Sequence, residues 1–284
     1  MRKLLASAKA GLSCRAENGL ILSSSKNWDR RVADAELLAR SAGFRDLRDR
    51  IVALARPRAG DVVVDLGSGT GLLALAFASR SSRVWAIDSS AAMNEYLDVK
   101  AASAGLTNLE TVRASVISLP LVDGTADLVV SNYCLHELGD RDKELALAEA
   151  MRVLKPGGRL LIADMMFSLN PLAARDRRVI TDKLRQLARR GLPGIWRVIK
   201  NSVRLASGRW ERPASAGWWR DALVRCGFEH VRVEILAHEG GIAIADAPAG
   251  RVGHERSSID QAAVSTQIRN GSPVKLASVN DRTA

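Results

Sequence analysis

Cysteine is scarce in this chain of 284 residues, which contains only Cys14, Cys134 and Cys226. The three are odd in number and far apart, so they predict neither a disulfide framework nor a metal cluster. Long apolar runs are also absent, since none reaches the roughly 18 residues that a membrane-spanning helix needs. The first twelve residues are basic, and Lys9 interrupts their apolar residues before a signal-peptide core can form. These absences predict a cytoplasmic protein without a metal site.

Positive charge is abundant by contrast. Lysine and arginine number 42 against 31 aspartate and glutamate, which gives a formal net charge of +11. Such a balance is compatible with nucleic acid, anionic lipid or acidic substrates as partners. A hydrophobic content of 47% allows one sizeable core. No internal repeat is visible, so the chain reads as one domain with an insertion or a tail.

The stretch from Val62 to Gly71 joins an apolar strand to a glycine-rich turn, and an apolar helix is expected over 72–78. Only glycine lets ligand atoms approach the backbone this closely. A dinucleotide fingerprint would place a third glycine at position 72, which is Leu72 here. The carboxylate of Asp65 suits a ligand with a cationic end. S-adenosylmethionine (SAM) has an ammonium, a sulfonium and no phosphate, so the loop predicts SAM.

A second strand, 83–87, ends at Asp88, about 20 residues past the turn. An acidic residue at this place can accept hydrogen bonds from both ribose hydroxyls of a nucleotide-like ligand. Ser89 and Ser90 follow it, so capping of the next helix is the alternative role for this carboxylate. Its distance from the glycine turn favours ribose binding.

Strands and helices alternate along the middle of the chain. Strands are expected at 62–64, 83–87, 109–113, 126–130, 159–164, 231–236 and 241–245, and helices at 72–78, 91–104, 141–154 and 218–228. This order predicts an α/β fold: a Rossmann-like, doubly wound, mostly parallel seven-stranded sheet with an antiparallel final pair and a helical insertion. Ligands of such sheets bind outside the carboxyl ends of the strands, where Asp65, Asp88, Asn132, His136 and Asp164 all fall.

Two helices are expected before the first strand, between Trp28 and Ala55, with Gly43 separating them and Pro57 ending the second. Trp28 and Asp29 are candidates for the mouth of a substrate site, or for an amphipathic anchor of this cap.

The chain resembles class I SAM-dependent methyltransferases, and within them the small-molecule group that includes the quinone-ring methyltransferases. The resemblance covers roughly residues 50–165. The matching segments are Val64-Asp65-Leu66-Gly67-Ser68-Gly69-Thr70-Gly71, Asp88, the span from Leu119-Pro120 to Asn132, and Val153-Leu154-Lys155-Pro156-Gly157-Gly158-Arg159-Leu160. The resemblance implies that Asp65, Gly67 and Gly69 hold the methionine end of SAM, and that Ser68 and Gly71 of the same loop also bind the cofactor. It also implies that Asp88 holds the ribose and that Asn132 lines the floor of the site.

One position departs from the pattern of that family. An acidic residue following a glycine usually stands five places before Pro120, and this chain has Ala114-Ser115 there. The Ser115 hydroxyl can donate or accept a hydrogen bond near adenine N6, but it carries no charge.

Most of the net positive charge lies in an insertion at 167–217. This segment holds twelve lysines and arginines against three acidic residues, which is nine of the eleven surplus charges. Apolar residues alternate with them at helical spacing on both sides of Gly191-Leu192-Pro193-Gly194, which predicts two basic amphipathic helices. Three roles stay open for them: a lid over the site, contact with an anionic membrane surface that would make the protein peripheral, and contact with nucleic acid.

The predicted domain organisation is a loosely ordered segment 1–27, a helical cap 28–56, a SAM-binding core 57–166, the basic insertion 167–217, the end of the sheet 218–247 and a disordered tail 248–284. The segments 1–50 and 167–217 are expected to shape the pocket for the methyl acceptor. The sequence does not specify an oligomeric state.

Methyl transfer from a sulfonium is an in-line displacement, in which the enzyme holds three atoms in line and keeps water out. His136 is the candidate general base because its ordinary pKa is near neutral; Tyr133 and Glu137 are the alternatives, and a capping or packing role for His136 stays open. The predicted enzyme acts on an O, C or N atom of a small or lipid-like acceptor. A SAM-responsive nucleic-acid-binding protein, an RNA methyltransferase using the basic insertion, and an inactive partner subunit are the rival functions. The Pro-Pro-aromatic and Pro-Cys runs typical of DNA methyltransferases are absent around Asn132-Tyr133-Cys134.

Overall fold

The computed structural model describes residues 27–168, 177–178, 181, 185, 212–236 and 239–250. Its strands are β1 (Val62–Leu66), β2 (Arg83–Asp88), β3 (Leu109–Arg113), β4 (Ala126–Asn132), β5 (Leu154–Met165), β6 (Glu229–Ile235) and β7 (Gly240–Asp246). Its helices are α1 (Val32–Ala39), α2 (Ala42–Ala55), α3 (Ala74–Ala78), α4 (Ala91–Ser103), α5 (Asp140–Val153) and α8 (Ala216–Arg225), with short 3-10 turns η1 (Trp28–Arg30) and η2 (Leu135–Glu137).

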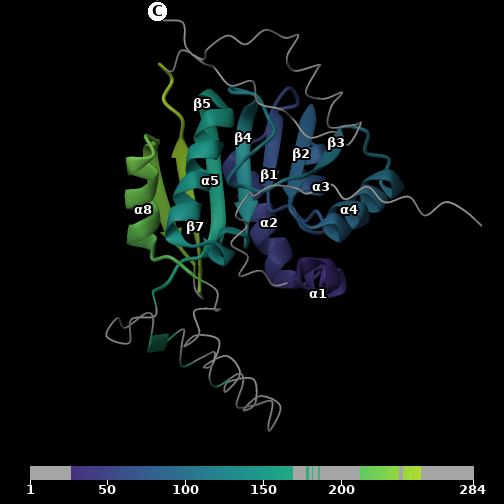
Figure 1. The fold of residues 1–284 in the computed structure, drawn as a ribbon, viewed down its shortest axis with the longest axis horizontal. Helices are drawn as coiled ribbons and strands as arrows, with labels where there is room; N and C mark the ends of the chain where they lie inside the picture. The colour runs from purple at the N-terminus through teal and green to yellow at the C-terminus, as the bar shows by residue number, and fades with distance from the viewer. Residues whose placement is uncertain are drawn as a thin grey trace, which may run out of the picture.

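The strands form one sheet in the order β3-β2-β1-β4-β5-β7-β6. The strands from β3 to β5 are parallel, and β7 runs antiparallel to both of its neighbours. Figure 1 shows the strands side by side, with α4 at the β3 end of the sheet and α8 at the β6–β7 end. The predicted sheet, including its antiparallel final pair, is confirmed.

Each face of the sheet is covered by its own set of helices. Side chains that alternate along β1 illustrate this, since Val64 and Leu66 pack in the core with α5 and α8, while Val63 packs in the core with α2, α3 and α4. A parallel strand that is buried on both faces reads as a continuous apolar run, which is why 62–64 contains only valine.

Serine begins three of the helices. The hydroxyls of Ser41, Ser90 and Ser215 accept hydrogen bonds from the backbone N–H three residues on, at the start of α2, α4 and α8. At the other end of α2, Arg56 adopts a left-handed conformation (φ 51°) directly before Pro57, so the predicted stop is confirmed.

Three details differ from the prediction. Gly43 lies inside α2, and the break between the first two helices falls at Arg40 and Ser41, because Ser41 supplies the cap. The helix after the glycine loop starts at Ala74 rather than at residue 72, since turns occupy the preceding residues. Residues 155–158 belong to the beginning of β5, where the pairing with β4 shifts register.

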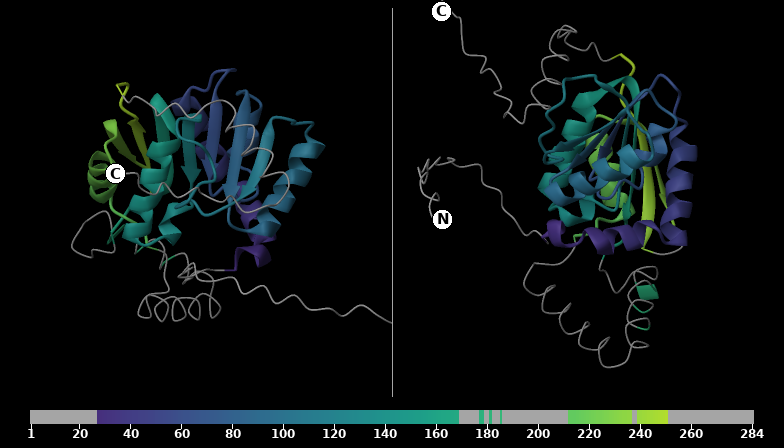
Figure 2. Two further views of the ribbon diagram at one scale, coloured as in Figure 1. Left: turned by 45° about the horizontal axis from the view of Figure 1, so that its top comes forward. Right: turned by 90° about the vertical axis from the view of Figure 1, so that its right-hand side faces the viewer.

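The N-terminal elements lie at the carboxyl ends of the strands. Asp29 of η1 contacts the beginning of α4, which follows the carboxyl end of β2, and both views in Figure 2 place α1 beyond one end of the strands. Within the described part of the chain, no helix is long and apolar enough to cross a membrane.

Candidate functional site

The glycine loop after β1 depends on three glycines in the left-handed region: Gly67 (φ 71°), Gly69 (φ 51°) and Gly71 (φ 88°). A Cβ on Gly67 would lie 2.2 Å from the Sγ of Cys134, and a Cβ on Gly71 would lie 2.3 Å from a methyl group of Leu97, so packing within the protein excludes a side chain at both. A Cβ on Gly69 would meet no atom within 4 Å. Gly67 and Gly71 therefore shape the loop, and Gly69 faces open space.

Polar atoms without partners gather where β1 and β4 end. Asp65 Oδ2, Ser68 Oγ and Asn132 Oδ1 are buried and have no hydrogen-bond partner among the described residues. A buried polar atom without a partner costs roughly 1–3 kcal/mol, so such atoms are rare and call for a ligand or another explanation. Three of the six such atoms in the described residues lie at this one edge of the sheet, which makes the edge a candidate binding site.

The carboxyl of Asp65 is 2% exposed. Burial raises its pKa, and the neighbouring carboxylate of Asp88 adds to the effect, while the backbone N–H of Ala74 opposes it; the pKa is about 7. A cationic ligand group beside Asp65 would favour the ionised form and lower this pKa.

Asp88 connects the end of β2 to the glycine loop. Its Oδ2 accepts a hydrogen bond from the backbone N–H of Gly69 (2.9 Å), and its Oδ1 accepts one from the N–H of Ser90 (2.9 Å). Burial raises its pKa even so. The carboxylate therefore lies against the one loop glycine with open space beside it.

Capping of α4, the alternative role for Asp88, falls mainly to two other residues. Ser90 is the N-cap of the helix. The Oδ1 of Asp29 accepts hydrogen bonds from the Ser90 hydroxyl (2.6 Å) and from the N–H of Ala92 (3.2 Å). Asp29 thus fastens the N-terminal cap to the start of α4.

Ser115 lies just after β3 and is exposed. It pairs with Ser118 in an isolated bridge, and its hydroxyl accepts a long hydrogen bond from the N–H of Ile117 (3.5 Å). The hydroxyl is therefore accessible, and its contact with adenine stays a prediction.

His136 is buried against the carboxylate of Asp164. Asp164 was expected at the same edge of the sheet, but no particular role was predicted for it. The Nδ1 of His136 lies 2.6 Å from Asp164 Oδ1, and its backbone N–H donates to Asp164 Oδ2 at 3.0 Å. Its Nε2 lies 3.4 Å from Glu137 Oε1. Burial lowers the pKa of His136, but the Asp164 and Glu137 carboxylates raise it by more, to about 10. The imidazole is therefore protonated at neutral pH.

Tyr133 begins the turn between β4 and η2 in a left-handed conformation (φ 51°). Its ring lies 5.0 Å from that of Phe44 on α2 and 6.0 Å from that of His136. The buried Met165 and Phe167, at and after the end of β5, pack beside it. Burial raises the pKa of the Tyr133 phenol, with Glu239 and Asp164 contributing, so this group is a poor base. The four side chains form an apolar wall beside His136.

Lys143 is a further buried charge that the sequence analysis did not identify. Its side chain is 0% exposed, and its Nζ donates to the carbonyl oxygen of Leu138 (2.8 Å) and to Asp140 Oδ1 (3.2 Å). The Nζ also lies 5.5 Å from the ring centre of Trp218, a residue of α8 whose ring contacts that of the neighbouring Trp219. The lysine stabilises the turn before α5 through these hydrogen bonds. In the sequence, only its spacing of three residues from Asp140 indicated that the two side chains could meet.

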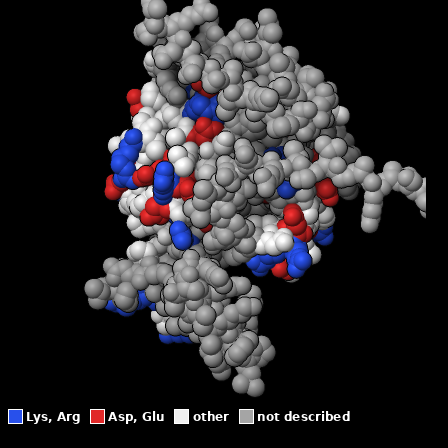
Figure 3. All heavy atoms as spheres, in the orientation of Figure 1, with Lys and Arg blue, Asp and Glu red and all other residues white. Residues whose placement is uncertain are grey.

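Most of the predicted insertion, 167–217, lies outside the described residues, as do nearly all of 1–27 and most of 248–284. Of the twelve basic residues in the insertion, Arg177, Arg178, Arg185 and Arg212 are described. On the face drawn in Figure 3, basic and acidic side chains of the described part are interspersed.

Comparison with known proteins identifies the methyltransferases as relatives. Residues 63–158 match the methyltransferase domain family. The chain is 34% identical over 145 residues to a demethylmenaquinone methyltransferase of Thermobifida fusca, covering 46% of this chain and 60% of that protein. It is 35% identical over 132 residues to a ubiquinone/menaquinone biosynthesis C-methyltransferase of Francisella tularensis subsp. holarctica, covering 45% and 52%. The chain thus spans between half and two thirds of the length of these curated relatives.

Solved structures with a similar fold also include a methyltransferase. A SAM-dependent methyltransferase from Aquifex aeolicus superposes with a TM-score of 0.54 at 20% identity, over 76% of this chain and 97% of that one. At this identity the likeness concerns the fold.

Proposed function

We propose that the protein is a SAM-dependent methyltransferase that transfers a methyl group to an oxygen, carbon or nitrogen atom of a small or lipid-like acceptor, since residues 63–158 match the methyltransferase domain family. One observation carries the proposal. Three buried polar atoms without partners in the described residues, on Asp65, Ser68 and Asn132, lie at the edge of the sheet where Gly69 faces open space.

The residues present fit SAM. Asp65 offers a buried carboxylate to the ammonium, and Asp88 offers one beside the open glycine to the ribose hydroxyls. Gly69 leaves its backbone accessible, Asn132 would form the floor of the site, and Ser115 after β3 would contact the adenine. When bound, SAM supplies a methyl group on a sulfonium, a carbon that is already activated for displacement.

The protein contributes position and a dry site. The loop glycines and Asp65 fix one side of the site, and Tyr133 with its apolar neighbours excludes water from the other. His136 is the proposed proton-handling residue. With Asp164 at 2.6 Å it carries its proton at neutral pH, and its Nε2 would donate a hydrogen bond to an acceptor oxygen in place of its 3.4 Å contact with Glu137. It can accept a proton only as the pH approaches its raised pKa.

The acceptor follows from the side chains that surround His136. Phe44 and Tyr133 present partly exposed aromatic surface at the carboxyl ends of β4 and β5, and the buried Met165 and Phe167 pack beside Tyr133. Such a wall favours an apolar, planar acceptor. The names of both relatives refer to quinones, one as a demethylmenaquinone methyltransferase and the other as a ubiquinone/menaquinone biosynthesis C-methyltransferase, so a quinone-type ring is the first acceptor to test.

The decisive experiment incubates the purified chain with methyl-labelled SAM and an extract of small molecules and lipids, followed by mass spectrometry. We expect a product heavier by one methyl group and an equal amount of S-adenosylhomocysteine. Gly69→Val should abolish both, and the matched Gly60→Val, at a glycine with open space far from the site, should not. Label found in added RNA would overturn the acceptor class while leaving methyl transfer in place. Absence of SAM binding by the folded chain would overturn the proposal as a whole.

A further inference from the structure

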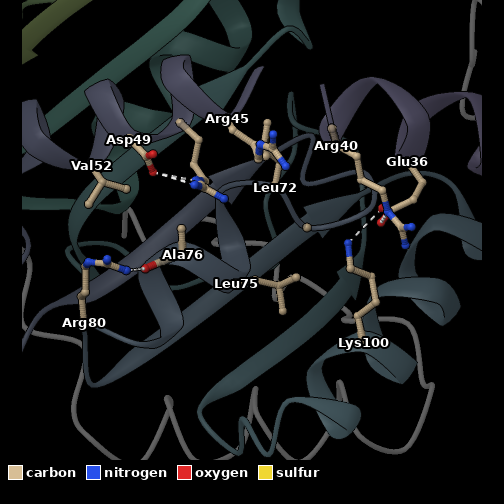
Figure 4. A pocket seen from close by; sticks show the side chains of 13 residues that line it. Glu36, Arg40, Arg45, Asp49, Val52, Leu72, Leu75, Ala76, Arg80 and Lys100 are labelled. Atoms are coloured by element: carbon tan, nitrogen blue, oxygen red, sulfur yellow. Dashed lines mark hydrogen bonds and ion pairs between the residues drawn. The ribbon is translucent and has the colours of Figure 1, made fainter. Parts of the chain in front are cut away.

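A cavity lies behind the glycine loop, on the face of the sheet covered by α2, α3 and α4. Its volume is about 420 Å³. Residues of α1, α2 and α4 line it together with Gly71, Leu72 and α3, and Figure 4 shows basic side chains from several elements around Leu72, Leu75 and Ala76. Nothing in the proposed methyl transfer uses this cavity.

The charge of the lining is strongly positive. Five basic residues line the cavity: Arg40, Arg45, Arg48, Arg80 and Lys100. They face two carboxylates, Glu36 and Asp49, which leaves a surplus of three positive charges. An anion would compensate this surplus.

Both carboxylates are already engaged. Glu36 accepts hydrogen bonds from Arg40 Nε (2.8 Å) and Lys100 Nζ (2.9 Å). Burial alone would raise the pKa of Glu36, but these hydrogen bonds outweigh burial and lower the pKa. Asp49 accepts a hydrogen bond from Arg48 Nε (2.8 Å). The remaining guanidinium groups of the lining, those of Arg45 and Arg80, therefore have no carboxylate partner within the described residues.

Arg45 and Arg80 are the available guanidinium groups. Arg45 makes no side-chain hydrogen bond or ion pair with another described residue. Arg80 uses its Nη1, which donates to the carbonyl oxygen of Ala76 (2.6 Å) and to the hydroxyl of Ser79 (2.8 Å); its other nitrogens have no partner among the described residues. Planar guanidinium groups of this kind match phosphate oxygens in paired hydrogen bonds.

The remaining lining is apolar. Val52, Leu72, Leu75 and Ala76 are partly exposed and form the wall between the arginines. We propose that this cavity binds a phosphate group carried on a small organic molecule, with the arginines on the phosphate and the apolar wall against the organic part.

The cavity adjoins the glycine loop. Lys100 Nζ donates to the carbonyl oxygen of Thr70 (2.8 Å) as well as to Glu36, and Thr70 lies between Gly69 and Gly71. A phosphate in the cavity therefore lies within reach of a residue that supports the cofactor loop.

The test is calorimetric titration with phenyl phosphate and with inorganic phosphate, at saturating S-adenosylhomocysteine so that the cofactor site accepts no probe. We expect one phenyl phosphate per chain, bound more tightly than inorganic phosphate because of the apolar wall. The double variant Arg45→Gln, Arg80→Gln should weaken binding about tenfold or more, since charge-assisted hydrogen bonds are lost. Both side chains are exposed, so the variant should fold.

Arg220→Gln is the control, because it removes one arginine charge from the exposed side of α8, on the other face of the sheet, and it is compared with Arg45→Gln and Arg80→Gln each made singly as well as with the double variant. Its affinity should equal that of wild type. Vesicles of phosphatidylglycerol in phosphatidylcholine form a second arm, and binding to them with the same arginine dependence would assign the phosphate to a lipid headgroup. Equal affinity of wild type and the double variant for every probe, or an equal loss in Arg220→Gln, would overturn the proposal and leave only attraction to the net charge.

Discussion

The imidazole of His136 lies 2.6 Å from the carboxylate of Asp164, and both side chains are buried at the carboxyl ends of the sheet. The pair contributes stability that is complete below the ordinary histidine pKa of about 6.5 and is lost as the pH rises toward about 10. It also decides when the imidazole can accept a proton.

His136→Ala should lower turnover by about 10²–10⁴ with little change in SAM affinity, if His136 is the base. The wild-type rate should then rise with pH toward about 10, because the neutral imidazole forms only there, and this dependence should vanish in the variant. Rates across pH 6–10, with a melting curve for each protein, check this. A loss of less than about threefold would leave the pair with a structural role.

Asp65→Asn should have opposite effects on stability and on binding. The raised pKa means that stability falls as the pH rises from about 4 to about 7, where the buried carboxyl ionises. At pH 8 the ligand-free variant should therefore unfold at a higher temperature than wild type. Its free energy of unfolding should be larger by up to roughly 4 kcal/mol, since one pKa unit equals about 1.4 kcal/mol. Its affinity for SAM should fall sharply. A variant that is less stable and still binds SAM would contradict both the burial argument and the site.

The same carboxyl predicts a pH dependence of binding. Below about pH 7 Asp65 must release its proton to meet the SAM ammonium, so wild-type affinity should weaken about tenfold per pH unit. Titrations in buffers of different ionisation enthalpy would detect the released proton. Asp65→Asn should show no such slope.

Gly67→Ala and Gly69→Ala should fail in different ways. The new Cβ at position 67 meets Cys134 at 2.2 Å, so this variant should lose stability. The Cβ at position 69 meets no protein atom, so this variant should bear only the strain of its backbone conformation, about 1 kcal/mol, and lose SAM affinity. Thermal melts and titrations separate the two. Equal SAM affinity of wild type and Gly69→Ala would remove the open space from the cofactor site.

Asp88→Ala should weaken SAM binding by roughly tenfold or more, because two charge-assisted hydrogen bonds to the ribose are lost. Asp88→Asn is the finer test. It keeps one acceptor for the N–H of Gly69, so it should preserve the loop while weakening the ribose contact. Unchanged affinity in the folded Ala variant would exclude Asp88 from the site.

The basic segment 167–217 should bind anionic vesicles, since each lysine or arginine near the surface contributes about 1 kcal/mol. We expect co-sedimentation that is lost at high salt and lost when Arg185, Arg189, Arg190 and Arg197 are changed to serine. RNA must be tested alongside, because its binding is also salt-sensitive. Failure to bind either at low salt would leave the segment as a lid over the site.

The sequence predicted the strands of the sheet and the glycine turn after β1 well, because both depend on local signals. The valine run at 62–64 and the glycines after it specify a buried strand and its turn without reference to distant residues. The contact of His136 with Asp164 joins residues 28 apart, and no periodicity encodes which strand-end carboxylate lies beside which turn. The cavity behind the loop was likewise unpredictable, because it joins Arg45 of α2 to Arg80 in the turn after α3, residues 35 apart in the sequence.

Local signals were also misleading where two of them competed. Gly43 suggested a break between helices, but the Ser41 hydroxyl, which accepts from the N–H of Phe44, begins the second helix two residues earlier. Lys155-Pro156-Gly157-Gly158 suggested a loop, yet β5 already includes them, because the register shift opposite Ala126 accommodates the irregular backbone.

The last described strand in the chain, β7, lies between β5 and β6 in the sheet. During synthesis, β6 leaves the ribosome before the strand that joins it to the rest of the protein exists. Until residue 246 is free to pair, β5 keeps an open, apolar edge, which is the kind of edge that recruits foreign strands. The interval between β5 and β7 contains the whole of 167–217, so the length of that segment sets how long the nascent chain remains exposed to aggregation.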